Sequence, residues 1–173
     1  CQVGDSYSNT FFVLENNTDT VSLIMKENYT DSYVPKTLAW CTDGGTDNAT
    51  CKNITLTGSS ATTGKDYLGH IKSIFNKDGV EVSFPSASQI AIADGKNYLN
   101  SPSLDQTWLY DYLINTTHPV SNVWGYWTIT PNATSSNATW YVNHYGSLSA
   151  DVVSYASMYG VRPVITISKS DIQ

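Results

Sequence analysis

The sequence has little charge and almost no arginine. Only 14% of its 173 residues are charged, Arg162 is the single arginine, and the formal net charge is −6 at pH 7. Proteins neutralise nucleic-acid phosphates with clustered Lys and Arg, and they read guanine edges most often with Arg. The composition therefore argues against a nucleic-acid partner.

The chain also lacks a long apolar run, and no stretch approaches the roughly 20 residues that cross a bilayer as a helix. It begins with Cys1 and shows no signal peptide, so we expect a processed or excised part of a longer chain, without a membrane span in this fragment. Apolar residues make up 40% of the sequence. A chain of this size buries roughly 70% of its unfolded surface as one domain. We expect a single domain over residues 1–173.

Recognisable catalytic and metal-binding signatures are missing as well. The histidines His70, His118 and His144 stand far apart, whereas a zinc site needs ligands at close, regular spacing. There is no phosphate-binding loop or nucleophile elbow. We expect neither an enzyme activity nor a cofactor. A hydrolase built from dispersed Ser, His and Asp is an alternative that would need His144, the only histidine in the candidate site described below.

Calcium is a second alternative. Several aspartates lie near Asn and Gly, although none shows the twelve-residue ligand spacing of a calcium loop. These residues are Asp19, Asp43, Asp47 and Asp94. A structural calcium ion is therefore an open alternative without support from spacing.

Cysteine is scarce, with residues at positions 1, 41 and 51 only. Cys41 and Cys51 bracket a loop of turn-forming residues, and the low-charge, Ser/Thr-rich composition is typical of a secreted protein. We predict that they form a disulfide, which would stabilise the fold by about 3 kcal/mol through loop closure. Two free thiols are the alternative. Cys1 is left to pair outside this fragment or to stay free.

Asn-x-Ser/Thr triplets are frequent. In a eukaryotic secreted protein they would accept glycans on surface loops, but in a chain this rich in Ser and Thr about half are expected by chance. A glycosylated eukaryotic origin therefore stays open. The triplets begin at Asn16, Asn28, Asn48, Asn53, Asn115, Asn132 and Asn137.

The spacing of apolar residues predicts an α+β domain. Short β-rich runs either side of a polar turn indicate a hairpin, and apolar residues at i, i+3, i+4 and i+7 indicate amphipathic helices. Turn-forming residues with one large anchor, Trp40, indicate an irregular excursion. We predict a hairpin over 11–14 and 21–25, the excursion over 29–64, helices over 67–75 and 87–93 and from residue 104, a strand over 80–84, and three or four strands after 124.

The last quarter, residues 124–167, interleaves two kinds of position. Framework positions are Trp124, Trp127, Trp140, Val142, Leu148 and the run 161–165. Between them lie Tyr, Ser, Asn, Asp, His and Ala, the composition of binding loops, in which Tyr gives contact area and Ser and Asn give adaptable hydrogen bonds. Side chains alternate along a strand, so Tyr141 and Asn143 should face away from Trp140 and Val142. A merely polar β surface is the alternative.

Residues 84–90, FPSASQI, resemble the helix start of C-type-lectin folds of the formylglycine-generating-enzyme type. Segments 125–128, 138–142 and 159–166 continue the resemblance in the right order. The set resembles cell-surface and pilin-linked domains of Gram-positive bacteria, and it is similar to the variable proteins of diversity-generating retroelements. The resemblance implies a C-type-lectin-like fold with twisted antiparallel sheets, two to three short helices and long loops.

Catalytic members of that superfamily carry cysteines in their C-terminal region, and this chain has none after Cys51. The resemblance therefore implies ligand binding by a rigid scaffold and not catalysis. Retroelement mutagenesis at adenines converts Asn codons to Tyr, Ser, Thr, His, Asp and Ala, the set found between the framework positions. Met158 fits a mutated Lys codon. Arg162 lies in the most family-like motif, and its planar fork suits a structural residue with several hydrogen bonds; a ligand-binding role is the alternative.

Together these observations predict an extracellular domain at a cell surface or pilus. Its ligand would be a protein or glycan on another cell or phage, or other pilus or surface subunits. A structural pilin or surface subunit without a ligand site is the alternative. We predict structural roles for Trp127, Trp140 and Arg162, and ligand-binding roles for Tyr141, Asn143, His144, Tyr145, Ser147, Ser149, Asp151, Ser154, Tyr155, Ser157 and Tyr159.

Overall fold

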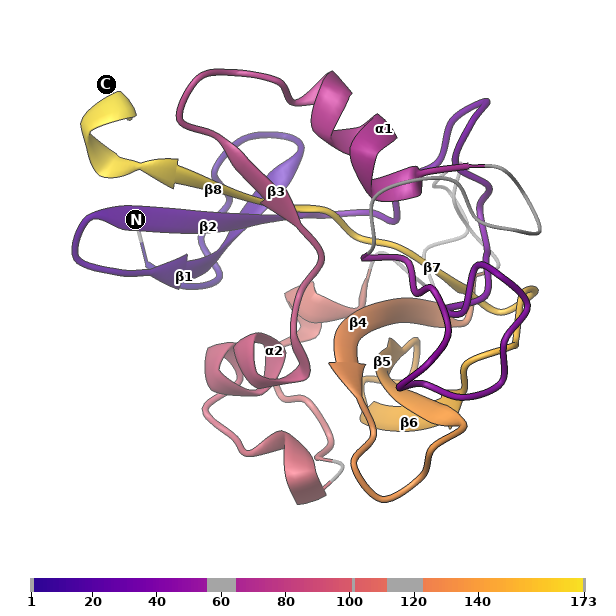
Figure 1. Cartoon of the computed structure of the whole chain (residues 1–173). Coiled ribbons are helices and arrows are strands. Elements are labelled where there is room, and N and C mark those ends of the chain that lie inside the picture. Colours follow the sequence, from indigo (N-terminus) through magenta and orange to yellow (C-terminus); the bar gives the residue numbers. More distant parts are fainter. Residues whose placement is uncertain (1, 56–64, 101, 112–122, 173) are drawn as a thin grey trace.

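Two four-stranded sheets and two short helices make up the fold, which is of the mixed α+β class (Figure 1). The computed structural model describes residues 2–55, 65–100, 102–111 and 123–172. The elements are β1 (Phe11–Asn16), β2 (Thr20–Met25), α1 (Tyr67–Ile74), β3 (Glu81–Ser83), α2 (Ala87–Ala93), β4 (Gly125–Pro131), β5 (Ala138–Asn143), β6 (Leu148–Val152), β7 (Tyr159–Gly160) and β8 (Val164–Ser168). Single 3-10 turns occupy Tyr98–Asn100, Thr107–Leu109 and Lys169–Asp171.

The first sheet joins the two ends of the described chain in the order β1-β2-β8-β3. All of its strands pair antiparallel, with Leu23 of β2 and Val82 of β3 both opposite Ile165 of β8. Figure 1 shows the indigo hairpin and the yellow last strand side by side. Apolar side chains are buried on both faces: Val13 and Leu23 belong to one cluster, and Leu14 and Ile24 to another.

The second sheet has the order β6-β5-β4-β7 and is strongly curled (Figure 1). The strands β4, β5 and β6 pair antiparallel, whereas β7 pairs parallel with β4. Gly125 begins β4 where the strands lie very close, since a Cβ there would lie 2.1 Å from the Val142 carbonyl oxygen. The position therefore requires glycine.

Both helices begin at residues that cap them. The Asp66 side chain accepts a hydrogen bond from the Gly69 N–H at the start of α1. At the start of α2, the Ser86 hydroxyl and the Gln89 side chain satisfy one another's backbone N–H groups in a capping box. The buried faces of the two helices pack into different clusters, α1 with Trp127 and α2 with Tyr126.

Strand β4 links these two clusters because its side chains alternate between its faces. Tyr126 packs with Trp140, Val142 and Ile90 in one cluster, and Trp127 packs with Trp40 and Val161 in the other. The Trp127 indole N–H donates to the Leu38 carbonyl at 2.8 Å. Trp127 and Trp140 are thus both buried parts of the framework.

Arg162 is fully buried and connects three segments. Its Nε donates to the Met25 carbonyl at 2.8 Å, its Nη2 to the Lys26 carbonyl at 2.7 Å and its Nη1 to the Leu109 carbonyl at 2.6 Å. The guanidinium lies 4.8 Å from the centre of the Tyr126 ring. Burial raises the pKa of Tyr126 to about 12, although the charge of Arg162 acts in the opposite direction.

Asn28 is a second buried polar residue, with 4% of its surface exposed. Its Nδ2 donates to the Gly125 carbonyl at 3.0 Å. A Cβ placed on Gly160 would lie 2.6 Å from the same nitrogen. Within the described chain its Oδ1 has no hydrogen-bond partner. Asn28 therefore sits in a tightly closed space beside β4 and β7.

Several predictions can be compared with these elements. The hairpin, the helices over 67–75 and 87–93 and the strand within 80–84 are present, and Cys41 and Cys51 form the predicted disulfide with a Cα–Cα distance of 5.6 Å. Five strands instead of three or four follow residue 124. The helix expected from residue 104 is replaced by the 3-10 turn Thr107–Leu109 in the described part. Tyr112 and Leu113 of that helix, Cys1, Asn115 and His118 lie outside the described residues.

The described ranges hold no helix with the length and apolar character needed to cross a membrane.

Candidate functional site

The predicted ligand residues divide among three places on and around the second sheet. Tyr141 and Asn143 of β5 share one face with Ser149 and Asp151 of β6, because Tyr141 pairs directly with Ser149. His144, Tyr145 and Ser147 belong to the turn between β5 and β6. Ser154, Tyr155 and Ser157 lie on the loop between β6 and β7.

The strand face is partly closed by its own contacts. Tyr141 is half-buried, with its ring centre 6.0 Å from that of Trp127 and 4.2 Å from that of Tyr159. The Tyr159 hydroxyl donates to Asp151 Oδ2, while Asp151 Oδ1 accepts from the Val152 N–H. Burial, and then the hydrogen bond with Asp151, raise the pKa of Tyr159 far above its usual value. The hydroxyl therefore keeps its proton and serves the fold.

Tyr159 itself is placed differently from the prediction that it contacts ligand. It is 3% exposed and packs against Trp127 with ring centres 4.5 Å apart. The reason is the parallel pairing of β7 with β4, which places Tyr159 opposite Gly125 and beneath the strand face. Tyr159 is a framework residue, and we withdraw it from the ligand set.

The turn between β5 and β6 is held by backbone and side-chain hydrogen bonds. The Asn143 Oδ1 accepts from the N–H groups of Tyr145 and Ser147, both at 3.0 Å. Gly146 has a φ of 79°, and a Cβ there would lie 2.5 Å from the Tyr110 ring, so only glycine fits this turn. The His144 N–H donates to the Trp124 carbonyl at 2.9 Å. The turn is therefore fixed without the side chains of Tyr145 or Ser147.

Three aromatic side chains gather at this turn: Trp124, His144 and Tyr145, which we call the aromatic platform. His144 lies 5.2 Å from the Trp124 ring and 3.8 Å from the Tyr145 ring, centre to centre. Tyr145 is 76% exposed and Trp124 is 52% exposed. The His144 Nδ1 lies 3.0 Å from the Trp124 carbonyl oxygen, which can only accept, so Nδ1 carries the hydrogen and Nε2 is the acceptor when the ring is neutral.

Trp124 is the second residue whose placement differs from its prediction. It was expected in the framework, but it lies just before β4 and its side chain is outside the packed clusters. Alternation cannot place a residue beyond the end of a strand, and tryptophan is more often buried than exposed. Trp124 therefore joins the candidate site, in exchange for Tyr159.

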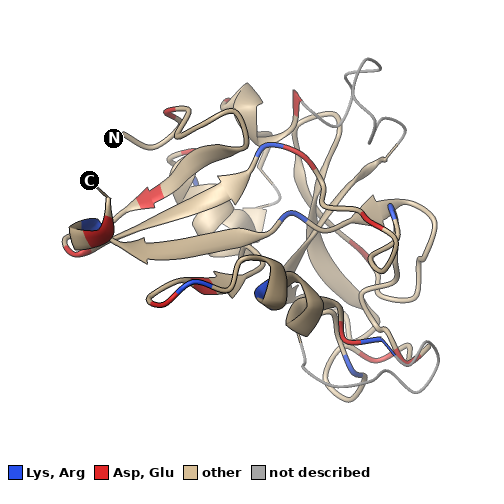
Figure 2. Ribbon diagram, turned by 90° about the horizontal axis from the view of Figure 1, so that it is seen from above, with Lys and Arg blue, Asp and Glu red and all other residues tan. Residues whose placement is uncertain are grey.

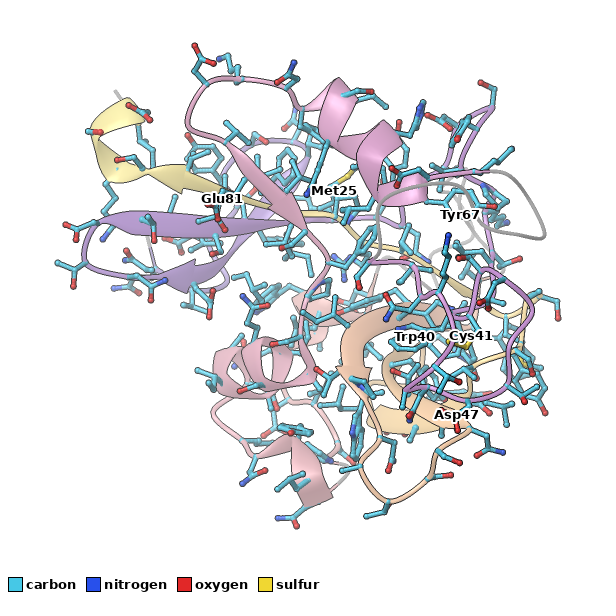
Figure 3. All side chains as sticks on the ribbon, viewed as in Figure 1. Met25, Trp40, Cys41, Asp47, Tyr67 and Glu81 are labelled. Carbon is cyan, nitrogen blue, oxygen red and sulfur yellow. A yellow bond between two sulfur atoms is a disulfide. The ribbon has the colours of Figure 1, made fainter. Side chains whose placement is uncertain are left out.

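The loop between β6 and β7 exposes Ser154, Tyr155 and Ser157. Tyr155 is 44% exposed, and its N–H donates to the Val152 carbonyl at 3.1 Å. Beside this loop runs a groove of about 330 Å³. Its walls come from this loop, the disulfide segment and the start of α1, where Figure 3 labels Cys41 and Tyr67 on the same side of the molecule: Pro35, Thr37, Leu38, Ala39, Cys41, Thr42, Gly44, Tyr67, Ser154 and Ala156.

The disulfide loop supports the loop between β4 and β5. The Asn48 Nδ2 donates to the carbonyls of Asn132, Ser135 and Ala138 at 3.1, 3.0 and 2.6 Å. Its backbone N–H donates to the Ser136 carbonyl at 2.6 Å. The sequence showed Asn48 only as part of a glycan-acceptor triplet, and its role as a clamp depends on contacts far along the chain.

Titratable groups cluster at another place, where residues 29–34 contact α1. Asp31 accepts from the Tyr29 hydroxyl and lies beside His70 Nε2, both at 2.7 Å, and it also accepts from the N–H groups of Tyr33 and Val34. Burial raises the pKa of Asp31, but these hydrogen bonds outweigh it and hold the pKa well below its usual value. Across the described residues, no group of three or more His, Cys, Asp or Glu could hold a metal ion.

The platform residues belong to a long stretch of chain that contains no charged residue. Between Asp111 and Asp151 the sequence contains no Lys, Arg, Asp or Glu. Figure 2 shows the charged residues in blue and red on a largely tan ribbon, and neither β4 nor β5 contains one. This gap was visible in the sequence, and it marks the same stretch that carries the exposed aromatic side chains.

The fold and the surface together define the class of this chain. It is an α+β domain with uncharged aromatic and hydroxyl side chains exposed on and beside a curled sheet. Residues 45–169 match the family model described as a domain of unknown function, DUF6273, and the chain belongs to this family. The match covers both helices and the whole second sheet but leaves out the β1–β2 hairpin. No match was found among curated proteins or among solved structures.

Proposed function

We propose that this chain is an extracellular ligand-binding domain of C-type-lectin-like fold, carried on a bacterial cell surface or pilus. Its variable surface consists of the strand face, the aromatic platform and the β6–β7 loop, and a retroelement diversifies it. The resemblance of residues 84–90, 125–128, 138–142 and 159–166 supports the fold. So does the architecture, because the first hairpin and last strand share a sheet while two helices and the second sheet lie between them in sequence.

The observation that carries the proposal is the contrast between fixed backbone and exposed aromatic side chains. Tyr145 and Tyr155 are 76% and 44% exposed, yet their backbone N–H groups are bonded to Asn143 and Val152. Contiguous exposed aromatic groups, such as Trp124, His144 and Tyr145, are typical of interaction sites, and Tyr offers contact area at low entropic cost. Such side chains can be replaced without loss of the scaffold, which is what a diversified surface requires.

Binding can be tested by adding fluorescently labelled protein to a panel of intact bacterial cells and measuring cell labelling by flow cytometry. We expect Tyr145→Ala combined with Tyr155→Ala to abolish cell labelling, while the Tm stays within about 2 °C because surface changes rarely exceed 0.5 kcal/mol. Ile92→Ala is the matched control, since Ile92 is 66% exposed on α2 and outside the candidate surface. Labelling that survives the double substitution would contradict the assignment of ligand binding to this surface.

Diversification has a separate test in the locus itself. Sequencing the gene across many cells should show substitutions gathered at Trp124, on the strand face, at the exposed residues of the β5–β6 turn and at the β6–β7 loop. Trp127, Trp140, Tyr159 and Arg162 should be unchanged. Uniform sequences together with unaffected cell labelling would favour a structural pilin or surface subunit instead.

A further inference from the structure

The aromatic platform has features that identify a class of ligand. We infer that Trp124, His144 and Tyr145 bind the ring of a neutral saccharide. This inference rests on the proposed function and narrows the class of ligand. The inference concerns this platform only, and the strand face and the β6–β7 loop are left to other parts of a ligand.

The first feature is shape. Tyr145 is 76% exposed and Trp124 is 52% exposed, so their rings stand out from the surface and do not line a socket. His144 contacts both rings, at 5.2 and 3.8 Å between centres, and its plane is inclined at 71° to that of Trp124 and at 40° to that of Tyr145, so the three rings form one contiguous cluster that is not coplanar. The C–H faces of a pyranose ring stack on aromatic faces, and the two exposed rings, Trp124 and Tyr145, are available for such stacking.

The second feature is the arrangement of polar atoms at the ring edges. The Trp124 Nε1–H is a donor, the Tyr145 hydroxyl is both donor and acceptor, and the neutral His144 ring offers Nε2 as an acceptor because Nδ1 is turned to the Trp124 carbonyl. A saccharide carries hydroxyl groups around its ring, each of which donates and accepts. The platform therefore combines apolar ring faces with both kinds of hydrogen-bonding group at their edges.

The third feature is the charge distribution. No Lys, Arg, Asp or Glu occurs between Asp111 and Asp151, and the whole chain carries a net charge of −6. Lys96 lies near the turn, because its Nζ donates to the carbonyl of Ser103, which pairs with Ser147, but it is paired with Asp94 and Asp105. An anionic sugar would therefore gain little from Lys96 and would be repelled by the net charge. A cationic ligand would find no enclosing cage, because His144 fills the position between the two other rings.

The fourth feature is rigidity. Asn143, Gly146 and the two contacts of His144 with the Trp124 carbonyl fix the turn in the unbound protein. A surface already in its binding conformation loses little entropy on association. Protein partners usually anchor large side chains in desolvated pockets. The groove beside Ser154 offers such a pocket, and Trp124, His144 and Tyr145 are not among the residues that line it.

The inference is tested by titrating the ¹⁵N-labelled protein with neutral oligosaccharides and following the Trp124 indole N–H by NMR. The probes are cellohexaose, mannohexaose, xylohexaose, chitohexaose and lacto-N-tetraose, with sialyllactose as the anionic comparison. We expect at least one neutral probe to shift the Trp124 signal. Trp124→Ala and Tyr145→Ala should each weaken that binding at least tenfold. Sialyllactose should bind more weakly than lacto-N-tetraose, the neutral probe that also contains lactose.

Two variants serve as controls. Ile92→Ala removes an exposed apolar side chain on α2, outside the candidate surface, and should leave saccharide affinity unchanged. Tyr145→Phe should retain most of the affinity because the ring face remains. A panel in which no neutral probe moves the Trp124 signal overturns the inference, as does equal loss of affinity in Ile92→Ala.

Failure of the inference can be separated from failure of the proposed function. Cell labelling that needs Tyr145 and Tyr155 but is not reduced by the saccharides would keep the ligand-binding domain and assign it a protein ligand. Saccharide binding at Trp124 without any cell labelling would keep the platform and remove the proposed adhesive role.

Discussion

The two sheets use the same residue types for different purposes. In the first, apolar side chains of β1 and β2 are buried on both faces. In the second, Trp140 and Val142 are buried, whereas Tyr141 on the opposite face is half-buried and the adjoining turn carries Tyr145, which is 76% exposed. The difference shows that burial is more complete in the first sheet than at the end of the second, and that β4, with one side chain in each of two core clusters, joins those clusters.

The largest effect should come from breaking the connection between the sheets at Arg162. Arg162→Ala removes one donor from each of three carbonyls; Leu109 keeps the Tyr126 hydroxyl, whereas Met25 and Lys26 lose the guanidinium, and each group left unsatisfied costs about 1–3 kcal/mol in addition to the cavity left by the side chain. We expect a loss of about 4 kcal/mol or more, close to complete unfolding for a domain of ordinary stability. Arg162→Lys should retain only part of the stability lost in Arg162→Ala, because an ammonium group cannot hold three separate carbonyls in the fixed geometry of a guanidinium. Urea unfolding measures both; a loss below about 1 kcal/mol in Arg162→Ala would contradict the connecting role.

Two tryptophans three residues apart give the sharpest contrast between framework and surface. Trp127→Ala should cost about 3–5 kcal/mol as a large-to-small change in a packed core. Trp124→Ala should change stability by about 0.5 kcal/mol or less, as expected at an exposed position. Thermal unfolding of the two variants decides the matter, and similar losses in both would mean that Trp124 is part of the core.

The disulfide should have an intermediate effect. Replacing Cys41 and Cys51 together by Ala removes loop closure worth about 3 kcal/mol. Amide hydrogen exchange in the loop between β4 and β5 should become faster, because Asn48 no longer holds the carbonyls of that loop in place. Exchange at the β5–β6 turn should stay unchanged, since the Asn143 side chain holds it independently. Faster exchange spread evenly over both loops would contradict this local role.

The smallest effect should come from Asp31, which lies outside both sheets. Its folded pKa is lowered, so its contribution to stability is full above the unfolded value near 3.9 and is lost as pH falls through the folded pKa. Asp31→Asn should cost about 1 kcal/mol or less at pH 7, because the cluster is partly exposed. The gap between the two proteins should narrow below about pH 4. Urea unfolding between pH 2 and pH 7 tests this, and a gap that widens in acid would reverse the sign.

Local features could be read from the sequence, and long-range pairing could not. Both helices carry their caps and apolar spacing within a few residues, as Ser86 and Gln89 show. In the described part, the helix expected from residue 104 is only the 3-10 turn Thr107–Leu109, in which the N–H groups of Leu109 and Tyr110 bond to carbonyls three residues back. The segment before it is held by distant groups, the Asp94 carboxylate and the Gly146 carbonyl, which local apolar spacing cannot indicate.

The candidate site divides in the same way. Alternation indicated which face of β5 carries Tyr141, because the signal lies within one strand. Trp124 and Tyr159 exchanged roles because one precedes β4 and the other belongs to a two-residue parallel strand, where no periodicity exists. The uncharged stretch between Asp111 and Asp151 was the available signal for the platform.

The buried position of Asn28 decides how this protein can be produced. Asn28-Tyr29-Thr30 is an acceptor triplet that an oligosaccharyltransferase would modify on the nascent chain, before β4 and β7 close over it. A side chain with 4% exposure cannot carry a sugar, so a glycan there is incompatible with the native fold, whereas Asn16 and Asn137 are exposed and can tolerate one. Expression in a eukaryotic secretory pathway would trap part of the product unfolded. A bacterial periplasm, which oxidises the Cys41–Cys51 pair, suits the fold better when it lacks this transferase.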